Sequence, residues 1–341
     1  MGKQIALVGY GYWGPNLLRN FFETPECEIT YCCDKDMSKL KQARKRYPSI
    51  IVTPNYEEIL KDKELAGVII ATPTKFHFEL AKLALESDKD VLIEKPMTLT
   101  SEEARQLVDL AKKRKRILMV DHTFLYNEAV IKIKEIIDSG EIGEILYIDS
   151  VRANLGLFQL DSNVIFDLAV HDFSIIQYLT SKKPLSVQGF GKSHVNKQED
   201  VSYVTAEYTD GIFAHLHLSW LSPLKVRLMS IVGTKKMLVY DDMNASQKIQ
   251  VYEKGVTFEP NLFRKLEAAF ITYRSGDVWS PNIKEKEALG TMAKDFVNSM
   301  INRNDPLSNG RLGADIVELL EKSTESIRSG KKVKFNYANK K

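Results

Sequence analysis

Short, continuous apolar runs alternate with longer polar segments through the first third of the chain. Residues 66–71 and 91–93 show the pattern most clearly, because neither run contains a charged position. Such runs are typical of strands buried on both faces of a parallel sheet. Six strands are expected, at residues 5–8, 28–33, 50–52, 66–71, 90–94 and 117–120. Because polar, helix-forming segments separate them, the pattern predicts an α/β fold that begins with a doubly wound parallel sheet.

The pattern changes after Asp121. Strands then follow one another with little helix between them, at residues 145–154, 185–194, 201–209, 212–220, 226–232 and 237–240. Helices are expected at residues 128–139, 161–179, 284–302 and 313–329. Asp210-Gly211 between two strands is a hairpin signal. The sequence therefore predicts a parallel-sheet domain over residues 1–121 and an α/β domain with a mostly antiparallel open sheet over residues 122–341.

A glycine-rich turn joins the first expected strand to a helix. Gly9, Gly11 and Gly14 form the pattern G-x-G-x-x-G, which permits a tight turn, close approach of a pyrophosphate and close packing of the helix on the strand. Asp34 follows the second strand, where a carboxylate can accept hydrogen bonds from a ribose 2′-OH. The combination predicts a Rossmann domain that binds a dinucleotide. Asp34 favours NAD over NADP, because its charge opposes a 2′-phosphate, and the adjacent Lys35 softens this preference.

Two polar constellations are candidates for catalysis. Glu94-Lys95-Pro96 lies at the carboxyl end of the fifth strand, where open α/β sheets bind ligands and a lysine can share the proton of a reacting hydroxyl. A surface Glu/Lys pair is the alternative interpretation. Asp167 and His171 are four residues apart on one expected helix and share a face of it. A histidine there suits proton removal near neutral pH, and a structural Asp/His pair is the alternative.

Composition and charge limit which partners and sites are expected. With 48 basic and 45 acidic residues the net charge is +3, and the charges are interspersed, so no nucleic-acid partner is expected. No apolar run reaches about 18 residues and no leader pattern opens the chain, so no membrane partner is expected. The three clustered cysteines are interpreted as buried free thiols in a reducing cytoplasm. His215 and His217 are interpreted as a half-buried sheet face against another subunit rather than as metal ligands, and no metal is predicted.

These motifs together resemble the glucose-fructose oxidoreductase / inositol dehydrogenase (Gfo/Idh/MocA) family over essentially the whole chain. The glycine-rich turn, residues 71–74 with His77, Glu94-Lys95-Pro96 and the 167–172 helix occur in the family's order. The resemblance implies hydride transfer between a carbinol carbon of a sugar or cyclitol and a nicotinamide. It implies that Lys95 and His171 are the polar catalytic pair, with proton acceptance assigned to either, and that Asp167 positions the substrate or His171. The open sheet is implied to join a homodimer or homotetramer.

The resemblance also implies a set of contacts around each ligand. The implied cofactor contacts are Gly9, Tyr10, Gly11, Tyr12, Trp13, Gly14, Asp34, Lys35, Ala71, Thr72, Pro73, Thr74, His77, Glu94 and Lys95. The implied substrate contacts are Lys95, Tyr126, Asn127, Arg152, Asn154, Asp167, His171 and Arg274. Arginine suits a diphosphate because of its fork geometry.

Two stretches are similar to the nucleotide-sugar members of the family. They are Asp-Leu-Ala-Val-His-Asp at residues 167–172 and the Gly-Asp, Pro and Glu-Ala-Leu positions within residues 276–289. This similarity implies NAD-dependent oxidation of the C3 hydroxyl of a UDP-linked amino sugar, UDP-N-acetylglucosamine or its uronic acid. The alternatives are a cyclitol or free-sugar dehydrogenase, a 3-keto nucleotide-sugar reductase, and a non-catalytic NAD-binding regulator.

Overall fold

The computed structural model describes residues 2–156, 158, 162–258 and 271–336. These residues form two compact units. The first unit contains Met1–Asn127 and Lys286–Glu321, and the second contains Glu128–Glu285 and Lys322–Lys341. The functional division predicted from sequence, 1–121 and 122–341, stays a prediction, because compactness does not report which residues bind cofactor or substrate.

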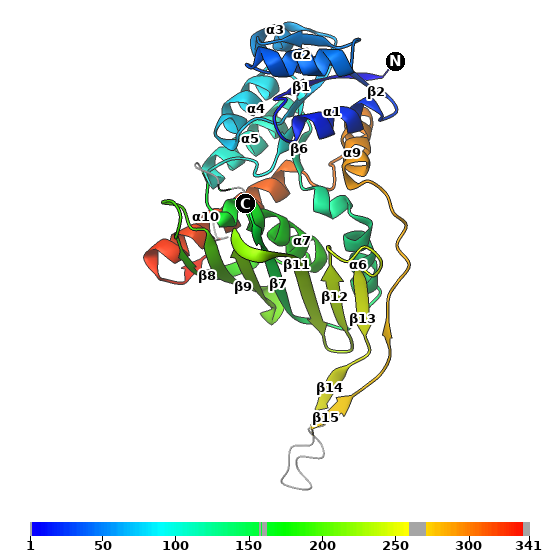
Figure 1. The fold of residues 1–341 in the computed structure, drawn as a ribbon, viewed down its shortest axis with the longest axis vertical. Helices are drawn as coiled ribbons and strands as arrows, with labels where there is room; N and C mark the ends of the chain where they lie inside the picture. The colour runs from blue at the N-terminus through cyan, green and yellow to red at the C-terminus, as the bar shows by residue number, and fades with distance from the viewer. Residues whose placement is uncertain (1, 157, 159–161, 259–270, 337–341) are drawn as a thin grey trace. The chain divides into compact units, whose positions relative to one another are not determined.

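The first unit is built on a six-stranded parallel sheet with the order β3-β2-β1-β4-β5-β6 (Figure 1). The strands are β1 (Lys3–Val8), β2 (Cys27–Cys33), β3 (Ile51–Thr53), β4 (Leu65–Ile70), β5 (Asp90–Glu94) and β6 (Leu118–Asp121). The helices between them are α1 (Gly14–Phe22), α2 (Met37–Arg46), α3 (Tyr56–Lys61), α4 (His77–Glu86) and α5 (Ser101–Arg114), with short 3-10 turns η1 (Thr74–Phe76) and η2 (Thr123–Tyr126). The predicted doubly wound parallel sheet is confirmed.

Burial explains why continuous apolar runs form these strands. Every residue of β5 and of β6 is buried, because helices cover both faces of the sheet. Helices α4 and α5 pack side by side over one face, and α1 and α9 (Ala288–Asn302) pack side by side over the other (Figure 1). Helix α5 begins with a capping box between Thr100 and Glu103, which satisfies amide groups at its N-terminus.

Helix α9 lies late in the sequence but belongs to the first unit. The rings of Phe21 and Phe296 meet edge to face, with centroids 6.1 Å apart. Gly67 of β4 leaves room for the side chain of Met300, since a Cβ built at Gly67 would lie 2.9 Å from its Cε. Periodicity predicts such a helix but does not predict which sheet it covers.

The second unit carries a nine-stranded mixed sheet with the order β16-β13-β12-β11-β7-β10-β9-β8-β17. Its strands are β7 (Ile145–Leu155), β8 (Pro184–Lys192), β9 (Val201–Tyr208), β10 (Phe213–Ser219), β11 (Leu221–Gly233), β12 (Met237–Asp241), β13 (Ile249–Tyr252), β16 (Val278–Trp279) and β17 (Val333–Lys334). Among the described strands of this sheet, only the β10/β7 pair is parallel, so the predicted mostly antiparallel sheet is confirmed. Strands β14 (Gly255–Phe258) and β15 (Ile271–Arg274) pair with each other outside this sheet.

Helices α6 (Glu128–Asp138) and α7 (Val170–Thr180) pack against each other in the second unit, and α7 packs on β7. Ala214, Leu216 and Leu218 of β10 are fully buried, as the alternation in the sequence predicts. His217 lies on the opposite face of β10 and stacks on Tyr203, with ring centroids 4.6 Å apart. Within the described residues, no helix has the length and apolar character needed to cross a membrane, and no cluster of three or more His, Cys, Asp or Glu residues could hold a metal ion.

Several helix boundaries differ from the sequence expectation. The helix expected over 161–179 is a π-helical turn, η3 (Ile165–Ala169), followed by α7. Residue 161 lies outside the described residues. Helix α9 begins four residues later than expected, after Glu287, and α10 (Gly310–Ser329) begins three residues earlier. Periodicity does not define helix ends, which depend on the local backbone bonds.

Candidate active site

The glycine-rich turn between β1 and α1 has the shape of a phosphate cradle. Gly9 has φ +97°, and a Cβ at this position would lie 2.5 Å from the carbonyl oxygen of Ala71. A Cβ at Gly14 would lie 2.3 Å from the carbonyl oxygen of Gly9. A Cβ at Gly11 would meet nothing within 4 Å, so the space beside this residue is open to a ligand. The turn and the N-terminal end of α1, which no side chain caps, fit the pyrophosphate of a dinucleotide.

Asp34, just beyond the end of β2, braces this turn. Its Oδ2 accepts a hydrogen bond of 2.7 Å from the backbone N–H of Tyr10, and its Oδ1 accepts one of 2.8 Å from the backbone N–H of Asp36. The ammonium of Lys39 lies 3.8 Å from Oδ2. Each carboxylate oxygen keeps a further lone pair, so Asp34 has acceptor capacity for a ribose hydroxyl. Contact with the ribose stays a prediction.

His77 links the turns that follow β4 and β5. Its Nε2 lies 2.8 Å from the carbonyl oxygen of Thr72, and its Nδ1 lies 2.9 Å from that of Pro96. A neutral imidazole donates to one of these oxygens and a protonated ring donates to both. Burial lowers the pKa of His77. The ring therefore holds together the two turns that carry Ala71–Thr74 and Lys95, and its contact with a cofactor stays a prediction.

The carboxyl ends of β5 and β6 bring a lysine beside two buried acids. Glu94 and Asp121 are register partners on these neighbouring strands, and both side chains are buried. The hydroxyl of Thr123 donates to Oδ1 of Asp121. The charge of Lys95 acts on both carboxyl groups and on the buried ring of His122. Sequence reasoning selected Glu94 and Lys95 but missed Asp121 and His122, although both follow directly from the end of the sixth strand.

Asp167 and His171 lie where η3 passes into α7 in the second unit. Oδ2 of Asp167 accepts a hydrogen bond of 3.0 Å from the indole N–H of Trp220, a fully buried side chain on the sheet side. The hydroxyl of Ser174 donates to the carbonyl oxygen of His171 at 2.7 Å. π-Helical turns widen the spacing of side chains and occur frequently at functional sites. The sequence selected both residues, whereas the indole partner was not predicted.

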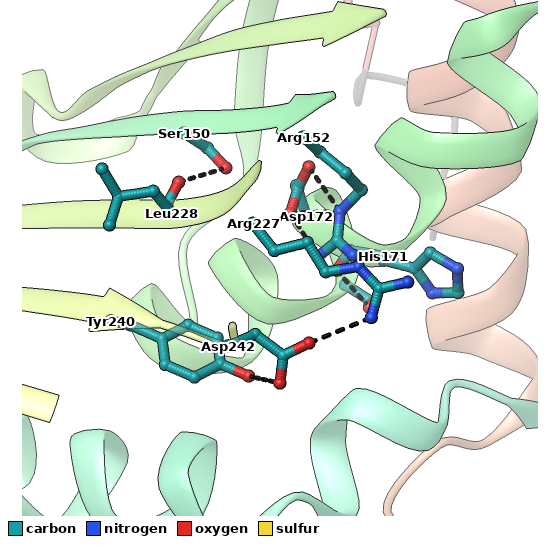
Figure 2. Close-up of polar contacts among 9 residues, drawn as sticks. Ser150, Arg152, His171, Asp172, Arg227, Leu228, Tyr240 and Asp242 are labelled. Atoms are coloured by element: carbon teal, nitrogen blue, oxygen red, sulfur yellow. Dashed lines mark hydrogen bonds and ion pairs between the residues drawn. The ribbon is translucent and has the colours of Figure 1, made fainter. Parts of the chain in front are cut away.

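A buried ion pair anchors α7 next to His171 (Figure 2). The guanidinium of Arg152 donates to Asp172 through Nε at 3.0 Å and Nη2 at 2.8 Å, and the two residues are 4% and 2% exposed. Arg227 and Asp242 form a second, more accessible pair nearby, with 3.0 Å between Nη1 and Oδ2. Arg152 was predicted to contact a diphosphate. The Nε/Nη2 edge of its guanidinium is engaged by the buried carboxylate of Asp172, and contact with a diphosphate stays a prediction.

Tyr126 is also buried. Its hydroxyl donates to Oδ2 of Asp295 at 2.7 Å and lies 3.0 Å from the hydroxyl oxygen of Ser308. These contacts hold the end of β6 to the segment around α9 in the first unit. The hydroxyl of Tyr126 therefore has a structural role, and its contact with a substrate stays a prediction.

The remaining predicted substrate contacts occupy different places. Arg274 of β15 is exposed, and its Nη2 donates to the carbonyl oxygens of Thr234 and Lys235 at 2.9 and 3.1 Å. Asn154 is half-buried on β7, and Asn127 follows η2 at the end of the first unit. Contact of these residues with a substrate stays a prediction.

Comparison with known families agrees with this arrangement. Residues 3–122 match the model described as "Oxidoreductase family, NAD-binding Rossmann fold", and residues 130–239 match the "GFO/IDH/MocA C-terminal domain". The chain belongs to the GFO/IDH/MocA oxidoreductase family. The family resemblance drawn from the motifs is thereby confirmed, and a nicotinamide cofactor is supported by the matched NAD-binding domain.

Individual relatives of this GFO/IDH/MocA member have several activities. It is 26% identical over 255 residues to UDP-N-acetylglucosamine 3-dehydrogenase of Acidithiobacillus ferrooxidans, covering 74% of this chain and 76% of the relative. It is also 26% identical to a 1-carboxy-3-chloro-3,4-dihydroxycyclohexa-1,5-diene dehydrogenase of Comamonas testosteroni and to inositol 2-dehydrogenase of Salmonella typhimurium, covering 63% and 62% of this chain. The chain spans 57% and 66% of the length of these two relatives. A solved structure of the Acidithiobacillus enzyme has a TM-score of 0.80 at 21% identity, covering 96% of this chain and 99% of that one.

Proposed function

We propose that the protein is an NAD-dependent dehydrogenase that oxidises the C3 hydroxyl of a UDP-linked amino sugar, UDP-N-acetylglucosamine or its uronic acid, to the 3-keto sugar. The observation that carries the proposal is Lys95, at the carboxyl end of β5 beside two buried acids, in the same unit as the glycine-rich turn. The nucleotide-sugar assignment is supported by the relative that is a UDP-N-acetylglucosamine 3-dehydrogenase.

The residues of the chain divide the work as follows. Bound NAD supplies the hydride acceptor. His171 takes the proton of the C3 hydroxyl, because an imidazole is a suitable base near neutral pH. The ammonium of Lys95 stabilises the negative charge that develops on the C3 oxygen. Asp167, fixed by the indole N–H of Trp220, positions the substrate or His171.

Specificity for NAD is assigned to Asp34. Its carboxylate is fixed beside the glycine-rich turn by two backbone N–H groups, and its charge opposes the 2′-phosphate of NADP. Kinetic comparison of the two cofactors tests this assignment. A higher kcat/KM with NADP than with NAD would contradict it.

The experiment that tests the function measures NADH absorbance when the protein and NAD are offered UDP-N-acetylglucosamine, its uronic acid, dTDP-glucose and myo-inositol separately. We expect NADH with a UDP-sugar. The variant Lys95→Ala should lose at least about a hundredfold in kcat/KM while NAD still binds, since a positioned proton-transfer or charge-stabilising group is worth about 10² to 10⁴. Lys63→Ala, which removes an exposed lysine of the same unit, is the matched control. Near-normal turnover in Lys95→Ala would refute the role of Lys95.

A second candidate is a cyclitol or free-sugar dehydrogenase using the same residues. It is favoured by the inositol 2-dehydrogenase among the relatives. UDP alone distinguishes the two, because a ligand that binds the folded protein raises its melting temperature. We expect UDP to raise it; no shift with UDP and NADH formation from myo-inositol alone would establish the second candidate.

Assembly through the C-terminal sheet is part of the proposal. Phe190, Tyr203 and Phe213 leave exposed aromatic surface on this sheet, and such surface favours association. A homodimer or homotetramer is the expected state, and light scattering measures it.

Cytoplasmic location stays a prediction drawn from the cysteines, which are free thiols. Burial raises their thiol pKa values, to about 12 for Cys32.

A further inference from the structure

The acids beside Lys95 are placed together by the sheet itself. Glu94 is the last residue of β5 and Asp121 the last residue of β6, and the two are paired across these parallel strands. They are 8% and 2% exposed. Two carboxyl groups therefore share one buried place at the edge of the sheet where this fold binds ligands.

Two adjacent buried carboxyl groups do not both ionise near neutral pH. Burial and then the neighbouring charge of Asp121 raise the pKa of Glu94 well above its usual range. Burial also raises the pKa of Asp121, although the hydrogen bond from Thr123 opposes this effect. The repulsion between the acids means that protonating one makes ionisation of the other easier.

Lys95 supplies the positive charge that acts on this pair of acids. The positive charge of Lys95 opposes the rise in the pKa values of both Glu94 and Asp121, so its ammonium lies within electrostatic reach of the two. The ring of His122 follows Asp121, but burial lowers its pKa to about 3, and it is neutral at physiological pH. His122 therefore adds no positive charge to the cluster.

We propose that Glu94 and Asp121 share a single proton, and that the one negative charge left on the pair holds the ammonium of Lys95 in place. Both acids are then positioning residues. The effect on catalysis rests on the proposed role of Lys95, whereas the shared proton does not depend on it. One consequence is specific to sharing: removing either acid leaves one ionised carboxylate, and only removal of both leaves none.

Infrared spectroscopy of the substrate-free protein tests the shared proton. At neutral pH we expect the carbonyl-stretch band of a buried protonated carboxylic acid, and we expect Glu94→Gln and Asp121→Asn each to abolish it. Glu318→Gln, which removes another buried carboxylate of the first unit, is the control and should keep the band. No band in the unmodified protein, or a band that survives in both single variants, overturns the proposal.

Reactivity of Lys95 tests the charge. An amine-acylating reagent at fixed pH is followed by peptide mass spectrometry in the unmodified protein, both single variants and the double variant. We expect the singles to label Lys95 within about threefold of the unmodified protein, and the double variant to label it about tenfold faster or more, since loss of an adjacent opposite charge frees the amine. Labelling in a single variant that equals the double variant, or no acceleration in the double variant, overturns the proposal.

The kcat/KM values of the single and double variants distinguish a shared charge from a purely structural role of the two acids. With the substrate found for the protein, the double variant should lose about a hundredfold in kcat/KM, and this loss should exceed the product of the losses in the two single variants. Circular dichroism establishes that each variant is folded. Effects of the two single variants that simply multiply in the double variant contradict a shared charge. If no substrate is oxidised, the infrared and labelling results still decide the proposal, so its failure is distinct from failure of the proposed function.

Discussion

The ion pair of Arg152 and Asp172 yields the most quantitative prediction, for the variant Asp172→Asn. The carboxylate accepts from Nε and Nη2 of the arginine at 2.8 to 3.1 Å, and both residues are almost fully buried. Burial by itself lowers the pKa of Arg152, but the charge and hydrogen bonds of Asp172, with the charges of Tyr240 and Asp242, together outweigh this effect, so the pKa of Arg152 is raised. Because a guanidinium is not deprotonated in proteins, Arg152 stays charged in its buried place when its partner is neutralised.

The expected cost follows from that stranded charge. Removing one partner of a buried pair costs about 3–5 kcal/mol, whereas replacing both partners by apolar side chains of similar size is near neutral or stabilising. We therefore expect Asp172→Asn and Arg152→Met each to lower the free energy of unfolding by about 3–5 kcal/mol, and Arg152→Met/Asp172→Leu to lower it by much less than their sum.

Urea unfolding followed by circular dichroism measures these changes. Asp242→Asn is the matched control, because Asp242 pairs with an arginine that is about a third exposed and should cost about 1 kcal/mol or less. A cost for Asp172→Asn no larger than that of the control, or additive costs in the double variant, would refute the reasoning. Because Asp172 follows His171 on α7, Asp172→Asn should also reduce kcat more than it changes the affinity for NAD.

Three further predictions concern other described residues. Gly9 has φ +97°, and Gly9→Ala places a Cβ 2.5 Å from a carbonyl oxygen, so this variant should destabilise the fold by about 1–3 kcal/mol. Gly11→Ala, by contrast, should fold normally and weaken NAD binding at least about tenfold in a fluorescence titration. Burial lowers the pKa of His122 to about 3 in the folded state, below its unfolded value of about 6.5. The free energy of unfolding should therefore fall as the pH drops below 6.5, by about 2 kcal/mol at pH 5. In urea titrations His122→Asn should remove this contribution, and an unchanged dependence of the unfolding free energy on pH would contradict it. Trp220→Phe removes the N–H donor to Asp167 and should lower the melting temperature and kcat together; unaltered kcat would show that this bond does not position the site.

The sequence predicts the first sheet well because its strands are buried on both faces. Runs such as residues 66–71 and 91–93 cannot be placed at a surface without exposing large apolar area, so the pattern has one reasonable interpretation. The partners of a helix are harder to predict. Helix α9 is amphipathic wherever it packs, and its position beside α1 depends on contacts such as Phe21 with Phe296, which are distant in sequence.

The candidate site shows the same division. Gly9, Lys95, Asp167 and His171 were selected because motifs mark them, while Asp121 was missed because it acquires meaning only when β5 and β6 lie side by side. Arg152 was interpreted as a phosphate contact because the fork geometry of arginine suits a diphosphate. Its burial against Asp172 depends on how α7 packs on β7, and local sequence does not reveal that packing.

The most direct test of the central claim follows the hydrogen that leaves the sugar. UDP-N-acetylglucosamine deuterated at C3 is incubated with the protein and NAD, and the reduced cofactor and the sugar are examined by mass spectrometry and NMR. We expect deuterium from C3 to appear in the reduced nicotinamide and the sugar to become a 3-ketone. Unlabelled reduced cofactor formed while deuterium stays at C3 would contradict oxidation at C3, as would oxidation of myo-inositol alone.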